Sequence, residues 1–281
     1  MPAHLDYQER AGCQRGVPVQ VLTSRFGLSE FLAGISKAAS RLLMLDYDGT
    51  LAPFQVRPDR AVPYPGVTEA LRELMDEGTT RVVIVSGRRA EELVPLLALD
   101  RHPEIWGGHG WERLMPDGEL KTQQPDPALR AALETATQAV GASTRLGARL
   151  EHKPASVALH WRGLPALAVA RVEAQARDAW LRCADGELDL LAFDGGLELR
   201  AKGCNKQHAV KAVLSETANE AAIAYLGDDT TDEDAFVAVR PRGVAVLVRP
   251  ELRETAADIW IRPPRELLAF MRHWLVGRLQ A

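Results

Sequence analysis

Short apolar runs that stop abruptly at polar turns recur along this chain. One run ends at Leu45, and three others cover residues 82–85, 222–226 and 244–248. Continuous apolar runs of this length, bounded by turn residues, are typical of fully buried strands. Helix-like patterns alternate with them, at residues 67–75, 90–97, 208–215 and 233–239. Strands that alternate with helices in this way predict an α/β fold with a parallel, Rossmann-like sheet.

The middle of the chain has a different texture. It contains a Pro116-Asp117-Gly118 turn, and its other patterns are helices near 128–140 and 166–183, an alternating segment at 156–161, and strand, turn and strand across 188–200. We interpret it as an inserted α+β domain, called the cap below. The predicted division is an extension at 1–40, partly disordered with a helix near 28–39, a core at 41–112, the cap at 113–196, and the rest of the core at 197–281.

Polar side chains follow three of the predicted strands directly. Asp46 and Asp48 follow the first run, Ser86 follows the second, and Asp228 follows the third. Ligands of open α/β sheets bind at the carboxyl ends of the strands. We therefore expect these side chains to converge on one edge of the sheet.

The segment Asp46-Tyr47-Asp48-Gly49-Thr50 places two carboxylates where a strand opens into a loop. One carboxylate can attack phosphorus and form an aspartyl phosphate, while the other donates and accepts the proton. A turn rich in Asp is the alternative for this motif taken alone. The other motifs of the chain weaken that alternative.

Carboxylates gathered around a phosphate require a compensating cation. Asp228 adds a further carboxylate to Asp46 and Asp48, and Mg²⁺ prefers oxygen ligands of this kind together with substrate phosphate. The chain is therefore expected to use Mg²⁺ as its cofactor. Glu233 is assigned instead to the start of the following helix, where the helix dipole favours an acidic residue.

Donors for a phosphate are present after the second strand and near residue 206. Ser86 and the neighbouring backbone N–H groups, that of Gly87 among them, can donate to phosphate oxygens at a strand-to-helix junction, although a helix cap is the alternative. Lys206 begins a helical segment, where a cation opposes the helix dipole. That unfavourable placement favours a functional role for Lys206.

These motifs, taken in order, resemble those of the haloacid dehalogenase superfamily, which combine an aspartate pair, a Ser or Thr, a Lys and a terminal acidic cluster. Further segments resemble the trehalose-6-phosphate phosphatase family, and they are Leu45–Leu51, Val85–Arg88, Gly108–Glu112, Glu151–Lys153, His160–Arg162, Leu197–Arg200 and Leu226–Glu233. Together they span nearly everything after residue 40. Ala201 stands where the family usually has Pro and Gln207 where it often has Gly, which affects only the expected loop shape.

The resemblance implies a role for each matching residue. Asp46 would be the nucleophile and Asp48 the acid and base, with Asp46, the Asp48 backbone carbonyl and Asp228 holding the metal. Phosphate would be bound by Ser86, Gly87, Arg88 and Lys206. The disaccharide would be bound by His109, Glu112, Glu151, Lys153 and Glu198. The expected reaction is hydrolysis of trehalose 6-phosphate to trehalose and phosphate, in trehalose biosynthesis.

Several alternatives stay open at this stage. His109 and His160 could be structural histidines, Arg88 could bridge core and cap, and Trp161 is expected to be a core aromatic. Sucrose phosphate or a mannosyl phosphate are alternative substrates. A domain that binds a sugar phosphate without turnover is disfavoured, because it would be expected to lack one of the catalytic residues.

Composition excludes several other classes of protein. The net charge of −4 comes without a run of basic residues, so we expect no nucleic-acid partner. The three cysteines Cys13, Cys183 and Cys204 lie far apart and lack metal-ligand spacing. No apolar stretch suits a membrane span or a signal peptide. A cytoplasmic enzyme with a small-molecule partner is the expectation, and the oligomeric state is not assigned.

Overall fold

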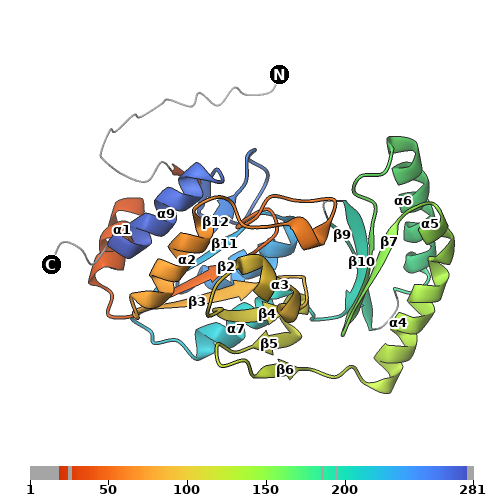
Figure 1. Ribbon diagram of the computed structural model, residues 1–281, viewed down its shortest axis with the longest axis horizontal. Helices are drawn as coiled ribbons and strands as arrows, with labels where there is room; N and C mark the ends of the chain where they lie inside the picture. The colour runs from red at the N-terminus through yellow and green to blue at the C-terminus, as the bar shows by residue number, and fades with distance from the viewer. Residues whose placement is uncertain (1–18, 25–26, 185–186, 194, 277–281) are drawn as a thin grey trace.

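The computed structural model describes residues 19–24, 27–184, 187–193 and 195–276. It contains two sheets, a large one in the core and a smaller one in the cap (Figure 1). Residues 1–18 of the predicted extension at 1–40 lie outside the described residues. No described helix is long and apolar enough to cross a membrane.

The large sheet has nine strands in the order β1-β13-β12-β11-β2-β3-β4-β5-β6. Their bounds are β1 Gln20–Val21, β2 Arg41–Leu45, β3 Thr80–Val85, β4 Glu104–Gly107, β5 Glu112–Leu114, β6 Leu120–Thr122, β11 Ala222–Gly227, β12 Val244–Val248 and β13 Ile259–Ile261. The strands from β13 to β4 are parallel, and β1, β5 and β6 extend the two edges antiparallel. Parallel strands need helices on both faces, which explains their continuous apolar runs.

Helices cover both faces of this sheet. Alternate residues of β2 point to opposite sides, so Leu43 and Leu45 join one apolar cluster while Leu42 and Met44 join another. The first cluster is closed by α1 Leu28–Lys37, α2 Val67–Asp76, α3 Ala90–Leu97 and α9 Arg265–Val276. The second is closed by α7 Lys206–Ser215 and α8 Glu233–Val239. Three short 3-10 turns, η1 Pro58–Arg60, η2 Gly108–Gly110 and η3 Thr230–Asp232, complete the loops.

The cap is an antiparallel sheet with helices on one side. Its strands run in the order β7-β8-β10-β9, with bounds β7 Arg149–Lys153, β8 Ser156–His160, β9 Leu188–Phe193 and β10 Gly196–Ala201. Its helices are α4 Pro127–Ala139, α5 Gly141–Arg145 and α6 Ala166–Leu181, which lie on the side away from the core (Figure 1). Trp161 and Trp180 are buried in the apolar cluster that joins helices to sheet, as expected for Trp161. The other face of the cap sheet is free to meet the core.

The expected fold class is confirmed, since a largely parallel core sheet carries an inserted α+β cap. The sheets nevertheless divide the chain differently from the predicted limits of 113 and 196. β5 and β6 belong to the core sheet because they pair onto β4, and β10 belongs to the cap sheet because it pairs with both β8 and β9. We therefore propose that the cap begins after Thr122 and ends at Ala201.

Candidate active site

The polar turns converge on one edge of the core sheet and face the cap sheet across a cavity of about 410 Å³. The cavity is lined from the core by Asp46, Asp48, Ser86, Gly87, Arg88, His109, Lys206 and Asp228, and from the cap by Glu151, Lys153, His160 and Glu198. The parallel pairing of β3, β2 and β11 explains the convergence, because it places the carboxyl ends of the three strands next to one another. With the exception of Glu112, the structure brings every predicted site residue to this cavity.

Glycine at position 49 allows the turn after β2 to contact the loop after β11 that carries Asp228. Gly49 has φ +87°, and a Cβ there would lie 2.1 Å from the Asp228 Oδ2 atom. Only glycine adopts that conformation freely and leaves the required space. The turn after β2 is therefore shaped to bring Asp46 next to Asp228.

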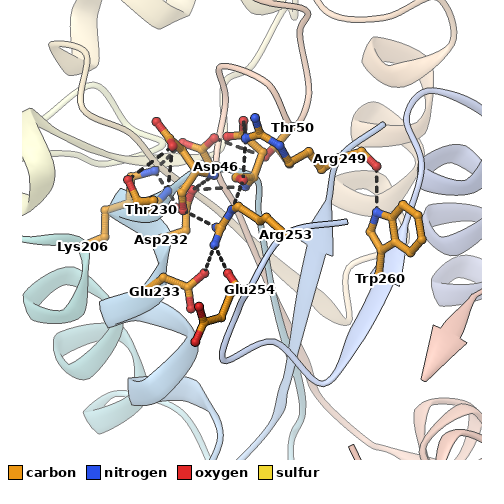
Figure 2. A network of polar contacts seen from close by, with 12 residues as sticks. Asp46, Thr50, Lys206, Thr230, Asp232, Glu233, Arg249, Arg253, Glu254 and Trp260 are labelled. Atoms are coloured by element: carbon orange, nitrogen blue, oxygen red, sulfur yellow. Dashed lines mark hydrogen bonds and ion pairs between the residues drawn. The ribbon is translucent and has the colours of Figure 1, made fainter. Parts of the chain in front are cut away.

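A buried lysine ties the nucleophile candidate Asp46 to the acidic loop, which is residues 228–232 between β11 and α8 (Figure 2). Lys206 Nζ donates to Asp46 Oδ1 at 2.6 Å and to Asp232 Oδ1 at 2.7 Å. Asp232 also accepts from Tyr225 Oη at 2.6 Å and from the backbone N–H groups of Asp228 and Asp229 at 3.1 Å each. Burial lowers the pKa of Lys206, but the Asp232 and Asp46 carboxylates outweigh it and raise that pKa. Lys206 is therefore a fixed cation.

The carboxylates of this cluster carry more negative charge than Lys206 offsets. Burial, together with the charge of Asp232, raises the pKa of Asp46 to about 7 against the opposing effect of Lys206. Burial and the charges of Asp46 and Asp232 likewise raise the pKa of Asp228 well above its ordinary range. Both shifts are expected of carboxylates held together away from water.

This cluster fits a divalent cation. Oxygen atoms of Asp46, Asp228 and Asp232 lie within 4.8 Å of one another, and Asp228 Oδ1 is buried without a hydrogen-bond partner. A buried acceptor left unsatisfied is costly, and an oxygen-preferring metal would satisfy it. Both oxygens of Asp232 accept hydrogen bonds, two of them from the backbone N–H groups of its own loop, so Asp232 orients Lys206 and that loop. Asp46 accepts from Lys206 and Thr50, and Asp228 Oδ1 is the oxygen of this cluster that is left without a partner.

Asp48 is held by an arginine of the neighbouring turn. Arg88 Nε donates to Asp48 Oδ2 and Arg88 Nη2 to Asp48 Oδ1, each at 2.6 Å, while Arg88 Nη1 donates to the Pro58 carbonyl at 2.9 Å. The paired geometry is the bidentate form that guanidinium and carboxylate groups favour. Arg88 thus bridges two segments of the core and does not link core to cap in this structure.

The Ser86–Arg88 turn packs against the loop that carries His109. The His109 N–H donates to the Ser86 carbonyl at 3.0 Å, and a Cβ on Gly87 would lie 2.6 Å from the His109 ring. His109 itself has φ +56°, a conformation rare for residues other than glycine. Such strain persists only where the surroundings enforce it, and here they hold the imidazole against the Ser86–Arg88 turn.

Buried polar pairs span the cap side of the cavity. Glu198 accepts from Lys153 Nζ at 3.0 Å and Ser156 Oγ at 2.6 Å, and its Oε2 lies 2.9 Å from His109 Nε2. Burial lowers the pKa of His109 against the opposing charge of Glu198, and the ring donates through Nε2–H to that carboxylate. Burial opposes ionisation of Glu198, yet His109 and Lys153 outweigh it and hold the pKa of Glu198 well below its ordinary range. This cluster joins the core loop to three strands of the cap, β7, β8 and β10.

Glu151 is oriented by a histidine of the next strand. Its Oε2 atom lies 2.6 Å from His160 Nε2, and the His160 ring packs edge-on against Phe193. Burial would raise the pKa of Glu151, but the hydrogen bond from His160 and the charge of Lys153 lower it to about 2. Glu151 and Lys153, two apart on β7, both face the cavity, as expected for alternate residues of a strand.

Glu112, which was expected to bind the disaccharide, is not among the residues that line the cavity. Its carboxylate is buried away from the cavity and accepts from the Ala90 N–H at 2.8 Å and from Arg89 Nε at 3.3 Å. The first N–H groups of a helix lack partners within the helix, and an acidic side chain there is stabilised by the helix dipole. Glu112 therefore stabilises the start of α3, and we propose this structural role in place of the expected contact with the sugar.

Replacing Glu112 by Ala is expected to lower the free energy of unfolding by about 1–2 kcal/mol, because the buried N–H of Ala90 loses its acceptor. Catalytic efficiency with a sugar phosphate should change little. Urea unfolding and phosphate release measured on the same preparation check both statements, with the exposed Glu91→Ala as control. Unchanged stability together with a large loss of catalytic efficiency would show that Glu112 binds the substrate.

Sequence reasoning did not assign several residues of the cavity wall, which are Phe54, Val56, Glu92, Leu164 and Phe193. Phe54 comes from the loop after β2 and stacks under the guanidinium of Arg162 from the cap, 4.4 Å from Arg162 Cζ to the ring centroid. Phe54 lies outside the recognisable motifs, and its only sequence signal is its proximity to the aspartate pair. Arg162 belongs to the His160–Arg162 segment of the family resemblance, which assigned it no role.

Comparison with known proteins agrees with this geometry. A trehalose-phosphatase family model matches residues 44–258, which include the aspartate pair, the cap and the acidic loop. The chain belongs to the trehalose-phosphatase family. This membership confirms the family resemblance described from the motifs.

Relatives in this family include a trehalose-phosphate phosphatase of Mycobacterium marinum, 34% identical over 246 residues that cover 81% of this chain and 60% of the relative. The Mycobacterium tuberculosis protein of the same name is 32% identical over 252 residues, covering 85% of this chain and 61% of the relative. The chain thus spans about 60% of the length of the curated relatives it matches.

Solved structures support the fold of this trehalose-phosphatase family member. The C-terminal domain of a Candida albicans trehalose-6-phosphate phosphatase superposes with a TM-score of 0.77 at 20% identity, covering 91% of this chain and 98% of that one. A phosphatase of the haloacid dehalogenase superfamily from Bacteroides thetaiotaomicron superposes with a TM-score of 0.56 at 16% identity, covering 84% of this chain and 95% of that one. Both place the chain in the haloacid dehalogenase fold.

Proposed function

We propose that this protein is a trehalose-6-phosphate phosphatase that hydrolyses trehalose 6-phosphate to trehalose and phosphate, in trehalose biosynthesis. One observation carries the proposal: the carboxylate cluster with its single buried lysine shares one cavity with the polar groups of the cap. Phosphoryl chemistry and sugar recognition thus meet in the same space. The family of the chain and the printed names of its relatives support the named substrate.

In the first step, an Asp46 oxygen attacks the phosphorus atom and forms an aspartyl phosphate. The bond from phosphorus to the sugar oxygen breaks, and Asp48 donates a proton to that oxygen, so that the sugar leaves as an alcohol. Lys206 holds one Asp46 oxygen at 2.6 Å, which fixes the carboxylate for attack. Ser86, the Gly87 N–H and Arg88 are placed to hold the phosphate oxygens.

In the second step, Asp48 accepts a proton from a water molecule as that water attacks the phosphorus atom. The bond from phosphorus to Asp46 breaks, which releases inorganic phosphate and regenerates the Asp46 carboxylate. Arg88 and Asp48 form a bidentate pair before substrate arrives. When substrate arrives and Arg88 turns toward the phosphate, this pair opens before the first step, and Asp48 takes up from water the proton that it then donates to the sugar oxygen.

Mg²⁺ is the proposed cofactor. Asp46, Asp228 and the backbone carbonyl of Asp48 would hold it, in agreement with the unpartnered Asp228 Oδ1 atom. When bound, the ion offsets the charge that gathers between carboxylates and phosphate. Its preference for oxygen ligands, substrate phosphate and retained water molecules matches the groups available here.

The cap is proposed to recognise the sugar. Glu151, Lys153, His109 and Glu198 present charged and polar groups to the cavity, and sugar hydroxyls can both donate to carboxylates and accept from ammonium groups. Closure of the cap over the core would exclude bulk water from the aspartyl phosphate. Binding energy from the second glucose would help to drive that closure.

Changing Glu151 to Gln is expected to reduce catalytic efficiency with trehalose 6-phosphate by roughly 5- to 150-fold, which corresponds to about 1–3 kcal/mol for a buried charged partner. Lys153→Met should act similarly, because Glu198 then loses its cation. Hydrolysis of a small aryl phosphate, which cannot reach the cap, should change little. The measurement is kcat/KM on both substrates, with His152→Gln, exposed on the same strand, as a matched control.

Equal losses on trehalose 6-phosphate and the aryl phosphate would show that these residues serve folding or phosphate binding, and the proposed sugar recognition would fall. Glucose 6-phosphate, as a half-sized substrate, should be hydrolysed inefficiently by the wild-type enzyme and should respond weakly to both substitutions.

A phosphate-release panel tests the named substrate. Trehalose 6-phosphate is expected to be hydrolysed with higher efficiency than sucrose 6-phosphate, a mannosyl phosphate or glucose 6-phosphate. Preference for one of the other sugar phosphates would leave the proposed phosphatase mechanism standing and would show that trehalose 6-phosphate is not the substrate. The proposed partner is this small molecule, and a cytoplasmic location and the absence of a nucleic-acid partner remain predictions.

A further inference from the structure

The loop between β12 and β13 reaches back to the acidic loop and grips it with two arginines (Figure 2). Arg253 Nε donates to the Asp228 carbonyl at 3.2 Å and Arg253 Nη2 to the Asp229 carbonyl at 2.7 Å. Arg249 Nη1 donates to the same Asp228 carbonyl at 3.3 Å and lies 3.8 Å from Asp228 Oδ2. Two successive peptide groups of the acidic loop are therefore held from one side.

Arg253 is itself anchored at its far end. Its Nη1 atom bonds Glu233 Oε1 at the start of α8 and also the Glu254 carbonyl. Glu233 accepts in addition from Thr255 Oγ1 at 2.9 Å and from the Ala256 N–H at 2.7 Å. Glu233, assigned from sequence to a helix start alone, thus ties the start of α8 to the arginine loop.

The Arg249 side of the grip is anchored to the sheet. The Arg249 carbonyl accepts from Trp260 Nε1 at 2.8 Å, and its N–H donates to the Ile261 carbonyl at 3.0 Å. Trp260 belongs to β13, the strand next to β12. Each arginine is therefore fixed by a partner outside the acidic loop before it contacts that loop.

Asp228 is consequently held on both sides of its α-carbon. Its N–H donates to Asp232 and its carbonyl accepts from Arg249 and Arg253, while its side-chain Oδ1 points into buried space without a partner. An unsatisfied buried oxygen favours rearrangement of its loop, and it persists only where the surroundings fix the backbone. The arginines supply that restraint without filling the ligand position.

We propose that Arg253, with Arg249 in support, is a positioning residue that sets the affinity of the Asp46–Asp228 cluster for a divalent cation. This inference rests on the metal role given to Asp228 in the proposed function. Arg253 suits the task because its planar fork reaches two carbonyls and a carboxylate at once, which a lysine ammonium on a flexible stem cannot reproduce. Residues that orient metal ligands typically change metal affinity 10- to 100-fold when they are replaced.

Direct binding of Mn²⁺ to the metal-free protein tests the inference, because paramagnetic Mn²⁺ prefers oxygen ligands and its free form can be measured by electron paramagnetic resonance. Arg253→Met is expected to raise the Mn²⁺ Kd by on the order of 10-fold, with Arg253→Lys intermediate. Arg177→Met is the matched control, since Arg177 is an exposed arginine of the cap helix α6 that pairs with Glu173 at 3.0 Å. The control should retain the wild-type Kd.

Turnover of an aryl phosphate against metal concentration gives a second measurement. In Arg253→Met the half-saturating metal concentration should rise by the same factor, while kcat at saturating metal returns close to the wild-type value. A purely structural role would lower Tm and kcat without moving the metal Kd. If Arg253→Met fails to fold, Arg253→Lys and Arg249→Met are measured in the same way and are expected to show smaller shifts in the same direction.

Wild-type Mn²⁺ affinity in a folded Arg253→Met protein overturns the inference and leaves the proposed function standing. Wild-type protein that binds no Mn²⁺ overturns the metal role itself, and with it the inference. The two failures are distinguished because the first is seen in the Mn²⁺ affinity of Arg253→Met and the second in that of the wild-type protein.

Discussion

Asp46→Asn is expected to abolish turnover, with a loss on the order of 10⁴-fold or more, while the protein remains folded. The amide cannot attack phosphorus, yet it nearly matches the carboxylate in shape. Its carbonyl oxygen can still accept from Lys206, and its NH₂ group can donate to Thr50 Oγ1, which now donates to Asp46 at 3.2 Å. Removing one of three crowded carboxylates should not lower stability near neutral pH.

Activity, thermal unfolding and covalent trapping check this expectation together. Borohydride reduction of rapidly quenched enzyme should convert the phosphorylated residue to homoserine, and peptide mass spectrometry should place it at position 46. Asp76→Asn, an exposed aspartate paired with Arg101, is the matched control and should be fully active. Recovery of the label at any other residue would refute the role of Asp46.

Removal of divalent cations is expected to lower kcat on the order of 10³-fold, because the transition state loses several kcal/mol of stabilisation. Asp46, Asp228 and Asp232 would then meet the substrate phosphate with Lys206 as the buried cation among them. Added Mg²⁺ or Mn²⁺ should restore the rate. Dialysis against a chelator, followed by metal titration, makes the measurement, and full turnover in excess chelator would rule out the metal assignment.

The same site predicts how stability depends on pH. The pKa of Asp46 lies at about 7 in the metal-free fold against an ordinary value of 3.8. The folded state therefore keeps a proton that the unfolded state releases, so this group costs stability as pH rises from about 4 to about 7. Bound metal competes with that proton, so the gain in Tm on adding Mg²⁺ should be larger at about pH 8 than at about pH 5. A gain independent of pH would contradict this assignment.

The core of the fold could be predicted from the sequence because its strands are buried on both faces. The apolar run at Val244–Val248 corresponds residue for residue to β12, in which every residue is buried, and the helix at Ala90–Leu97 corresponds to α3. Strand β4 escaped prediction because it is short, starts with Glu104 and ends in Gly107. Strand β7 escaped a full assignment because four of its five residues are charged or histidine.

The candidate site followed from sequence wherever the chemistry lies within one turn. Asp46, Ser86 and Asp228 could be brought together on paper because parallel strands end at the same edge. Partners far apart along the chain could not be found in this way, and Arg253 is the main example. Glu112 was assigned to the sugar because its motif matches the family, and its hydrogen bond to the start of α3 could not be foreseen because the two lie far apart along the chain.

The pairing of β2 with β11 has a consequence for synthesis on the ribosome. Arg41 lies opposite Ala222 in this pair, and the entire cap is inserted between them. The cap sheet can therefore form from contiguous chain while the apolar β2 still lacks one neighbour, since distant contacts carry a greater loop-closure cost than local ones. During that interval β2 is an unpaired edge strand that can associate with other chains. We therefore expect substitutions in β11 to affect aggregation during expression even where they leave the active site unchanged.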